Sequence, residues 1–185
     1  VDPHQRMNEA NASLAVQASE EGEINTLFDL LSSYGLEMAN DKIVGDDLNP
    51  SLVRSSSGKA YPFPYWMELG KNNISRNHPV SSLLNKLLFA DAGHFEITDE
   101  NQIVHSIVYT SAETAELSRY EIKKQSAEQL AANFAPGSHP PRNLVVYIDG
   151  PIEQAFADVD VEVESRNESL FAVSDADWIY NGYSM

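Results

Sequence analysis

Apolar side chains recur at helical spacing in three parts of the chain. Over residues 23–34 they fall at i, i+3, i+4 and i+7, and Gly35 follows as a helix stop. A leucine stripe over residues 79–89 begins with a proline, which suits the first turn of a helix. A third helix is expected to begin at the capping residue Ser126 and to end before Pro136.

Short apolar runs bounded by turn residues predict strands around these helices. Residues 144–148 are apolar without alternation, which is typical of a central strand covered on both faces. The runs 95–97 and 103–110 are separated by a short polar turn, which suits an antiparallel pair. Residues 61–67 contain two prolines that cannot donate to a ladder, so we expect an edge strand at most. The remaining candidates are residues 42–45, 52–54, 159–163 and 170–173.

The mixture of helices and strands predicts an α/β layered fold. Residues 1–22 are polar with few large apolar side chains, so they are expected to form an arm or loop. Residues 23–185 are then expected to form a single α/β domain, because a chain of 185 residues is long enough for one domain but short for two. The chain opens on Val1 without a signal-like segment, so we interpret it as an internal fragment of a longer protein.

Composition narrows the function classes. With 28 acidic and 12 basic residues the formal charge is −16, which argues against a protein whose main function is to bind nucleic acid or an anionic bilayer. Cysteine is absent, which excludes disulfides, thiolate nucleophiles and iron–sulfur clusters. The longest apolar run, residues 144–148, is far shorter than the roughly 18 residues of a membrane span.

Two acidic patterns and the histidines are candidates for chemistry. Asp175 and Asp177 follow a buried strand candidate, where α/β sheets bind ligands, but they also suit the cap of a helix beginning near Ala176. Alternating acids in residues 158–164 favour a solvated strand face over a calcium site. The five histidines lack metal-ligand spacing, so we expect surface or capping roles, with His78 at a helix N-cap or next to it, and no metal site.

The common catalytic signatures are missing from the sequence. There is no GxSxG elbow, no phosphate-binding GxxxxGK[ST] loop and no GxGxxG after a strand. Ser111, at the end of a predicted strand, has no identifiable base partner. The residues alone therefore indicate an acidic domain that binds something rather than a recognisable enzyme.

Short motifs occur in a fixed order over nearly the whole chain. They are Asp2-Pro3, LLSSYGLE at residues 30–37, DKIVGD at 41–46, NHPV at 77–80, VYTS at 108–111, LVVYIDG at 144–150 and LFAVSDADW at 170–178. In order and spacing they resemble the gliding-motility ABC transporter auxiliary family (GldG-like proteins). The NHPV motif before a leucine-rich segment is the best single match, and the colinearity of all of them carries the resemblance.

The resemblance has implications for fold and setting. It implies a flavodoxin-like or class I amidotransferase-like α/β domain, a three-layer sandwich with a mixed, mainly parallel sheet. It implies membrane anchors outside this segment, a place on the periplasmic side of the inner membrane of a Gram-negative bacterium, and ABC permease and ATPase subunits as partners. It also implies a segment that begins after the first strands of the fold, which leaves a sheet edge to pair with another chain, a second copy included.

We therefore predict a non-enzymatic, extracytoplasmic accessory domain of a gliding-motility-like ABC transport complex, acting by protein–protein contact without a cofactor. The predicted partner-contact residues are Tyr61, Phe63, Tyr65 and Trp66. The alternative is a small-ligand or sugar-binding α/β module with a pocket at the strand ends. Its predicted ligand-binding residues are Ser111, Asp149, Asp175 and Asp177. A degenerate hydrolase or amidotransferase relative is a third hypothesis, which the absence of cysteine disfavours.

Overall fold

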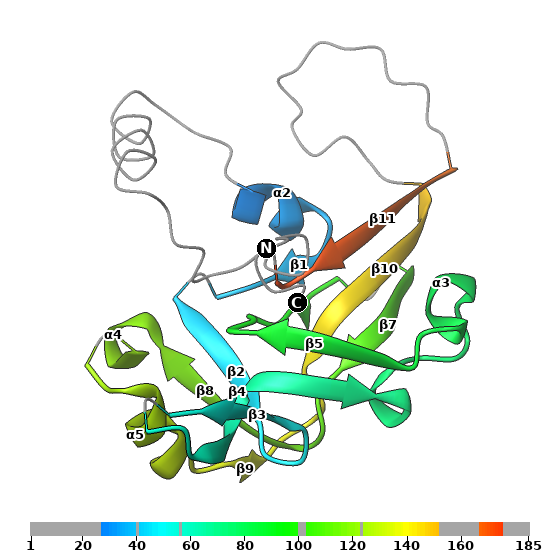
Figure 1. The fold of residues 1–185 in the computed structure, drawn as a ribbon. Coiled ribbons are helices and arrows are strands. Elements are labelled where there is room, and N and C mark those ends of the chain that lie inside the picture. Colours follow the sequence, from blue (N-terminus) through cyan, green and yellow to red (C-terminus); the bar gives the residue numbers. More distant parts are fainter. Residues whose placement is uncertain are drawn as a thin grey trace, which may run out of the picture.

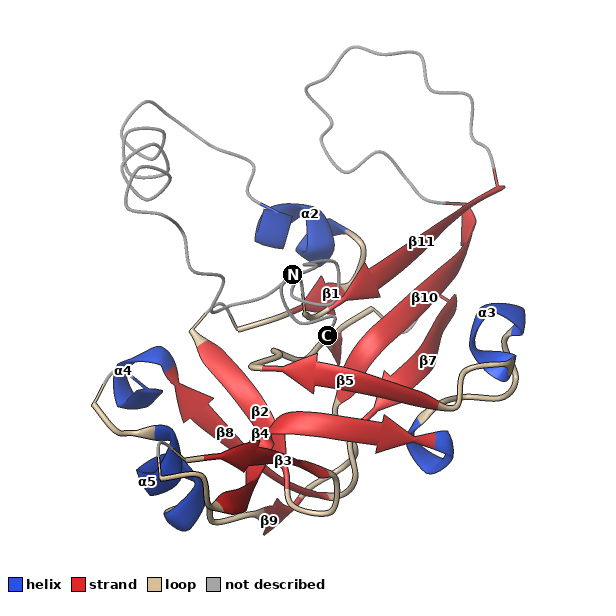
Figure 2. Ribbon diagram, in the orientation of Figure 1, coloured by secondary structure: helices blue, strands red, loops and turns tan. Residues whose placement is uncertain are grey.

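The computed structural model describes residues 27–39, 41–55, 57–99, 103–122, 124–151 and 167–175 (Figure 1). Its helices are short: α2 (Leu27–Ser33), the 3-10 helix η1 (Lys71–Asn73), α3 (Pro79–Ser82), α4 (Arg119–Ile122) and α5 (Ala127–Ala132). The strands are β1 (Leu36–Glu37), β2 (Lys42–Asp46), β3 (Pro50–Arg54), β4 (Ala60–Gly70), β5 (Lys86–Ala90), β6 (Glu96–Ile97), β7 (Ile103–Tyr109), β8 (Glu113–Ser118), β9 (Gly137–Ser138), β10 (Asn143–Pro151) and β11 (Asn167–Val173). Figure 2 shows that strands predominate over helices.

Every strand pairing in these ranges is antiparallel. The sheets have the orders β11-β10-β7, β3-β4-β5 and β2-β8-β9, and β1 pairs with β6. The predicted α/β sandwich with a mixed, mainly parallel sheet, flavodoxin-like or amidotransferase-like, is therefore wrong. Parallel strands need crossover connections of a dozen or more residues, usually helical, and the helices found here are too short to supply them.

The leucine-rich segment 79–89 explains much of this error. Only α3 is helical, and β5 pairs with β4 so that Leu88 lies opposite Glu68. Phe89 is buried whereas Leu88 is 49% exposed, so the alternation of a strand replaces the expected helical stripe. A run rich in leucine is compatible with the periodicity of a helix and with that of a strand. Pairing with the free edge of β4 favours the strand.

The proline-containing strand β4 lies in the middle of its sheet, so the expectation of an edge strand is also wrong. Its first half pairs with β3, with Pro62 opposite Leu52, and its second half pairs with β5 from Trp66 onward. The register with β3 shifts after Phe63, and Pro64 falls in that irregular stretch. Both prolines therefore precede the part of β4 that pairs with β5. Their missing N–H groups cost no backbone hydrogen bond between β4 and β5.

Other expectations have mixed outcomes. Strands are confirmed at residues 42–45, 52–54, 103–110, 144–148 and 170–173, and α2 confirms the first helix in part. The predicted pair of strands 95–97 and 103–110 is wrong, because β6 pairs with β1 and β7 pairs with β10. The predicted arm at residues 1–22 and the strand at 159–163 lie outside the described residues.

The core consists of three clusters of buried apolar side chains. One lies between β2, β4, β5, β7 and β10 and includes Val44, Met67 and Leu144, all 0% exposed. A second joins α2 and β1 to the other face of β10, and the third packs aromatic residues of β4 against β8 and α5. Both faces of β10 are therefore covered, as its continuous apolar run predicts.

Residues 92–95 connect the sheets. The amide of Val44 donates to the Ala92 carbonyl at 2.9 Å, and the amide of Phe95 donates to the Asn143 carbonyl at 2.8 Å. Between them, the amide of Gly93 donates to the Ser174 carbonyl at 3.3 Å. This segment therefore has a fixed path past β2, β10 and the end of β11. Within the described residues no helix has the length and apolarity to cross a membrane.

Candidate functional site

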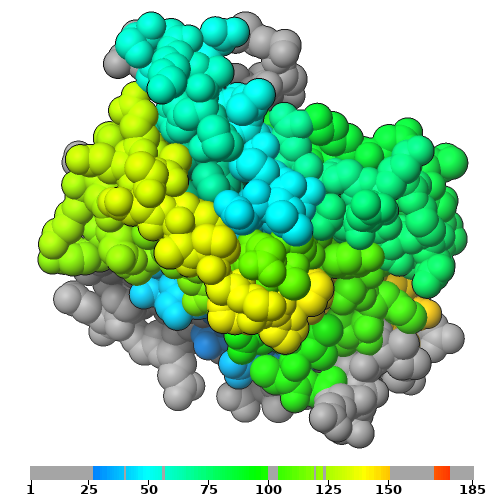
Figure 3. All heavy atoms as spheres, turned by 90° about the horizontal axis from the view of Figure 1, so that it is seen from below, coloured from blue at the N-terminus to red at the C-terminus, as the bar shows by residue number. Residues whose placement is uncertain are grey.

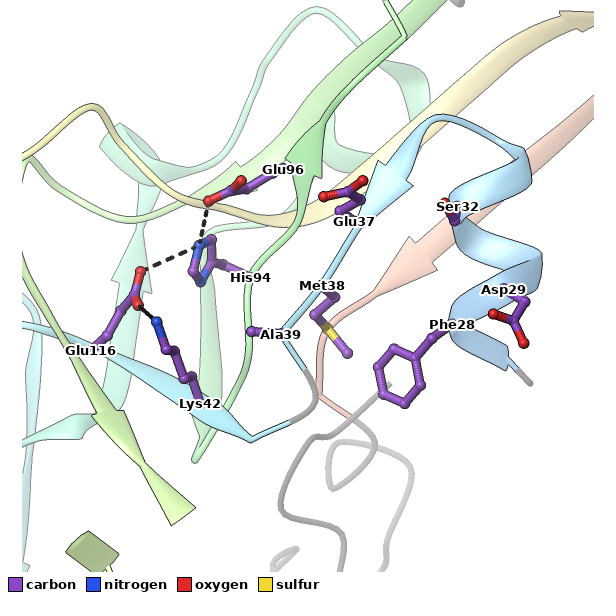
Figure 4. A pocket seen from close by; sticks show the side chains of 10 residues that line it. All are labelled: Phe28, Asp29, Ser32, Glu37, Met38, Ala39, Lys42, His94, Glu96 and Glu116. Atoms are coloured by element: carbon purple, nitrogen blue, oxygen red, sulfur yellow. Dashed lines mark hydrogen bonds and ion pairs between the residues drawn. The ribbon is translucent and has the colours of Figure 1, made fainter. Parts of the chain in front are cut away.

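A pocket of about 410 Å³ lies between α2 with β1 on one side and the β2–β8 pair on the other (Figure 4). Carboxylates predominate among its charged side chains, and apolar side chains form one wall. We call it the acidic pocket. Its lining residues are Phe28, Asp29, Ser32, Glu37, Met38, Ala39, Lys42, His94, Glu96 and Glu116.

The wall made by α2 and β1 is held by a sharp turn and by buried leucines. Gly35 adopts φ +70, which turns the chain from α2 into β1, and a Cβ there would lie 2.5 Å from the Cβ of Asp99. Leu31 and Leu36 are buried against β10, at 5% and 0% exposure. This packing fixes the position of Glu37, the next residue along.

Lys42 and Glu116 face each other across the β2–β8 pair. Lys42 lies opposite Ser118 and Val44 opposite Glu116, so the two charged side chains are diagonal neighbours on one face. The ammonium Nζ donates to Oε2 of Glu116 at 3.0 Å. This hydrogen bond and the carboxylate charge raise the pKa of Lys42.

Glu116 is held as a carboxylate by Lys42 and Arg142 at neutral pH, and by His94 as well once that imidazole is protonated at lower pH. Burial acts to raise the pKa of Glu116, but the hydrogen bond from Lys42 and the charges of His94, Lys42 and Arg142 together outweigh it, and the pKa is lowered. The ion pair with Lys42 is therefore present throughout the neutral range.

His94 lies at the floor of the pocket and is 5% exposed. Figure 4 shows its ring directed between two glutamates, with Nε2 at 3.7 Å from Oε1 of Glu96 and 3.6 Å from Oε1 of Glu116. Burial and the charge of Arg142 lower the pKa of His94, and the two carboxylates oppose this only in part. The imidazole is therefore neutral at pH 7.

Arg142 completes the group from the segment before β10. Its Nη1 lies 3.6 Å from Oε1 of Glu96 and its Nη2 lies 3.3 Å from Oε1 of Glu116. The backbone amide of Arg142 donates to the Thr110 hydroxyl at 2.8 Å, which anchors the residue, and its Nε is buried without a hydrogen-bond partner among the described residues. The guanidinium therefore bridges two strands that are far apart in sequence.

The lining carries four carboxylates and one ammonium, so it retains an excess of negative charge even when Arg142 is counted. Across the described ranges, no three His, Asp or Glu side chains converge in a way that could hold a metal ion. The arrangement suits an organic cation, whose charge the carboxylates would complement and whose apolar part Phe28 and Met38 would contact.

Ser111, a predicted ligand-binding residue, binds another side chain instead of lining a pocket at the strand end. Its amide and hydroxyl both donate to Asp46, which is 0% exposed. In Figure 3 the chain around residue 48 (cyan) lies close to the segment near residue 140 (yellow), in agreement with the hydrogen bonds from Asp47 to Glu113 and from His139 to Ala112. Ser111 therefore belongs to a packed junction of β2, β7 and β8.

The structure does not bring the other predicted ligand-binding residues into one site. Asp149 lies opposite Ile103, eight residues before Ser111 along the chain, which corresponds to about 26 Å of extended strand. The Asp175 carboxylate is buried and accepts a hydrogen bond from the amide of Ala90 at 2.8 Å. Asp177 lies outside the described residues.

The four aromatic residues predicted to contact a partner belong to the third core cluster. Phe63 and Tyr65 are buried at 7% and 4% exposure, whereas Tyr61 and Trp66 are partly buried. Edge-to-face contacts join Phe63 to Tyr65 and to Trp66. Packing therefore accounts for Phe63 and Tyr65, and only Tyr61 and Trp66 keep appreciable exposed surface.

Sequence reasoning missed the acidic pocket. His94 was expected at the surface or at a cap and is instead buried, whereas His78 is confirmed as the N-cap of α3. Lys42, Glu96 and Glu116 show no common spacing, because their neighbourhood arises from pairing between distant strands. The available local signal was a lone histidine, His94, between a leucine-rich segment and the strand candidate at residues 95–97.

Comparison with known families supplies the broader setting. A family model of ABC transporter auxiliary proteins, described as an ABC-type uncharacterized transport system, matches residues 1–185. The chain belongs to this family. The family resemblance drawn from the motifs is thereby confirmed, and the family name indicates an auxiliary component of an ABC-type transport system. Comparisons with curated proteins and with solved structures gave no match.

Proposed function

We propose that this ABC transporter auxiliary chain is a non-enzymatic accessory domain that works on the extracytoplasmic side of the membrane, in a complex with ABC permease and ATPase subunits. It acts by protein–protein contact, and the acidic pocket receives a basic side chain of the permease. Family membership supports the setting. The negative excess of the pocket lining is the observation that carries the mode of contact.

The pocket lining matches a lysine or arginine side chain in both charge and shape. Glu37 and Glu96 present carboxylates that a cation can pair with, while Phe28 offers a ring face and Met38 an apolar surface for the aliphatic stem. Lys42 and Arg142 hold Glu116 in place, so the ion-pair group provides a preformed wall. A preformed site binds with less loss of conformational freedom than a flexible one.

The proposal is tested by purifying the full-length protein from its native membranes in mild detergent and identifying the chains that accompany it. We expect permease and ATPase subunits in fixed proportion. Glu37→Lys places a positive charge in the pocket without altering the ion pairs of Lys42, His94 or Arg142, and recovery should fall at least about tenfold. Asp47→Lys, at an exposed site between β2 and β3, is the matched control.

Recovery of the unaltered protein without either subunit would contradict the accessory role. Equal losses for Glu37→Lys and Asp47→Lys would leave the complex standing but would contradict contact through the pocket.

The pocket volume of about 410 Å³ also favours a second candidate, a small organic cation. A ligand that binds only the folded state raises the melting temperature by mass action. Spermidine, arginine and choline are suitable probes in a thermal-shift assay. A shift that Glu37→Lys abolishes would favour the small ligand over the permease side chain.

A further inference from the structure

The loop around α3 exposes two apolar side chains. We call residues 74–85 the α3 loop. Leu83 is 86% exposed and Val80 is 59% exposed. Single exposed apolar side chains are ordinary, but two on one short, structured loop form a local apolar projection.

Hydrogen bonds within the loop hold this shape. The hydroxyl of Ser81, which is 0% exposed, donates to the Ser75 carbonyl at 2.7 Å. The guanidinium of Arg76 donates to the Ser82 carbonyl at 2.6 Å, and the amide of Val80 donates to Nδ1 of His78 at 3.3 Å. These hydrogen bonds form within the loop and fix its backbone conformation. The side chains of Val80 and Leu83 are therefore held in exposed positions by the loop itself.

A row of aromatic rings extends the apolar surface beside the loop. The His78 ring lies 4.4 Å from the Tyr147 ring and 5.5 Å from the Phe171 ring, measured between centroids. Tyr147 also stacks on His105, at 5.9 Å, so the row crosses β7, β10 and β11. Phe171 remains 40% exposed.

The charge of this region differs from that of the rest of the chain. Residues 69–90 contain no Asp or Glu, in a chain that has 28 of them, and they contain Lys71, Arg76 and Lys86. Lys86 pairs with Glu68, which leaves Lys71 and Arg76 as the cations near the α3 loop. At physiological salt the Debye length is about 8 Å, so carboxylates farther away than this contribute little to the field at the loop, whereas Asp149, which accepts a hydrogen bond from the Tyr147 hydroxyl at 3.4 Å, lies at the edge of the ring row.

We propose that the α3 loop is a membrane-contact site, which inserts Val80 and Leu83 among lipid headgroups while Lys71 and Arg76 face anionic phosphates. Apolar side chains flanked by basic residues bind bilayer interfaces, and aromatic rings favour the same depth. A chain of an ABC transport family has a bilayer within reach. The net charge of −16 limits general adsorption, so contact is confined to this one loop. The proposal does not depend on the acidic pocket.

Flotation of the 185-residue chain with lipid vesicles tests the proposal. The probes are vesicles of phosphatidylcholine alone and vesicles with roughly one third phosphatidylglycerol, an anionic content at which each nearby basic residue adds appreciable binding. We expect binding to the anionic vesicles at physiological salt. The double variant Val80→Asp with Leu83→Asp should lose at least about tenfold in partition, and Lys71→Glu about fivefold or more.

Leu48→Asp is the matched control, because Leu48 is 65% exposed but lies beside Asp46 and Asp47. It should bind vesicles as the unaltered chain does. Circular dichroism on every variant separates lost binding from lost folding. Absence of vesicle binding by the unaltered chain, or an equal loss in Leu48→Asp, would overturn the proposal. Concentration-dependent self-association through Leu83 without vesicle binding would also overturn it, in favour of a protein interface.

Discussion

The Asp46 carboxylate accepts two hydrogen bonds from Ser111, one from its amide and one from its hydroxyl, each at 2.6 Å. The same carboxylate also accepts from the amide of Leu48 at 3.0 Å and from the side-chain amide of Asn49 at 2.9 Å. Four donors therefore converge on one fully buried side chain at the end of β2. Asp46 thus ties the β2–β3 turn to the turn between β7 and β8.

Replacing Asp46 by alanine should destabilise the fold strongly. The change leaves the amides of Leu48 and Ser111 without their acceptor in a partly buried place, where each such loss costs up to about 1–3 kcal/mol. We expect the free energy of unfolding to fall by about 2–4 kcal/mol in urea titrations. Asp47→Ala, at the exposed neighbour, should change it by less than about 0.5 kcal/mol. Similar values for both variants would contradict the role given to Asp46.

Tyr65→Ala should lower the stability of the fold, whatever its effect on partner binding. Tyr65 is 4% exposed and its ring meets those of Phe134 and Phe63 at 5.3 and 5.7 Å between centroids. Removing a buried aromatic side chain costs about 3–5 kcal/mol. Tyr61→Ala, on the same strand but partly exposed, should cost less than half of that. Equal costs, measured by thermal unfolding, would show that the packing assigned to Tyr65 is not formed.

Gly45→Ala should be destabilising although only one methyl group is added. A Cβ at Gly45 would lie 2.6 Å from the Phe134 ring and 2.9 Å from the Tyr65 ring, so both rings would have to move. Overpacking of this kind costs about 1–3 kcal/mol. Gly70→Ala is the control, because a Cβ there meets nothing within 4 Å. A neutral Gly45→Ala would contradict the close approach of β2 to these rings.

The stability of the chain should fall as the pH falls below neutrality, because of His94. Burial and Arg142 lower the pKa of His94 below its ordinary value of 6.5, so the folded chain binds this proton less readily than the unfolded chain. The contribution of His94 is complete above that value and is lost as the pH falls through the lowered pKa. Glu116, whose pKa is lowered from 4.5, adds a further loss only at lower pH.

Thermal unfolding between about pH 7 and pH 5 measures this effect, since that range spans the titration of histidine. His94→Gln should reduce the dependence of the melting temperature on pH, whereas His139→Gln, at an exposed position, should retain it. An unchanged slope in His94→Gln would contradict the buried, neutral imidazole.

Local signals were predictable from the sequence, and long-range pairing was not. The capping roles of His78 and Ser126 follow from neighbouring residues and are confirmed, and Gln129 completes a capping box with Ser126. The path of residues 86–90 depends on β4, which begins 26 residues earlier than β5, and no local pattern reveals that pairing. Leu144 to Ile148 correctly indicated a covered central strand, but burial is the same for parallel and antiparallel neighbours.

The acidic pocket was unpredictable for the same reason. Glu37, His94 and Glu116 come from separate elements that meet only after β1 pairs with β6 and β2 pairs with β8. The family was nevertheless readable from colinear short motifs, because their order does not depend on the fold that they adopt.

Site-specific photocrosslinking in native membranes tests the central claim most directly. A photoreactive amino acid is placed at Ser32, an exposed residue that lines the acidic pocket, and separately at Leu48, which is also exposed but does not line the pocket. The account predicts a crosslink from Ser32 to the permease subunit and none from Leu48. Absence of any crosslink from Ser32, or the same products from both positions, would contradict partner contact through the acidic pocket.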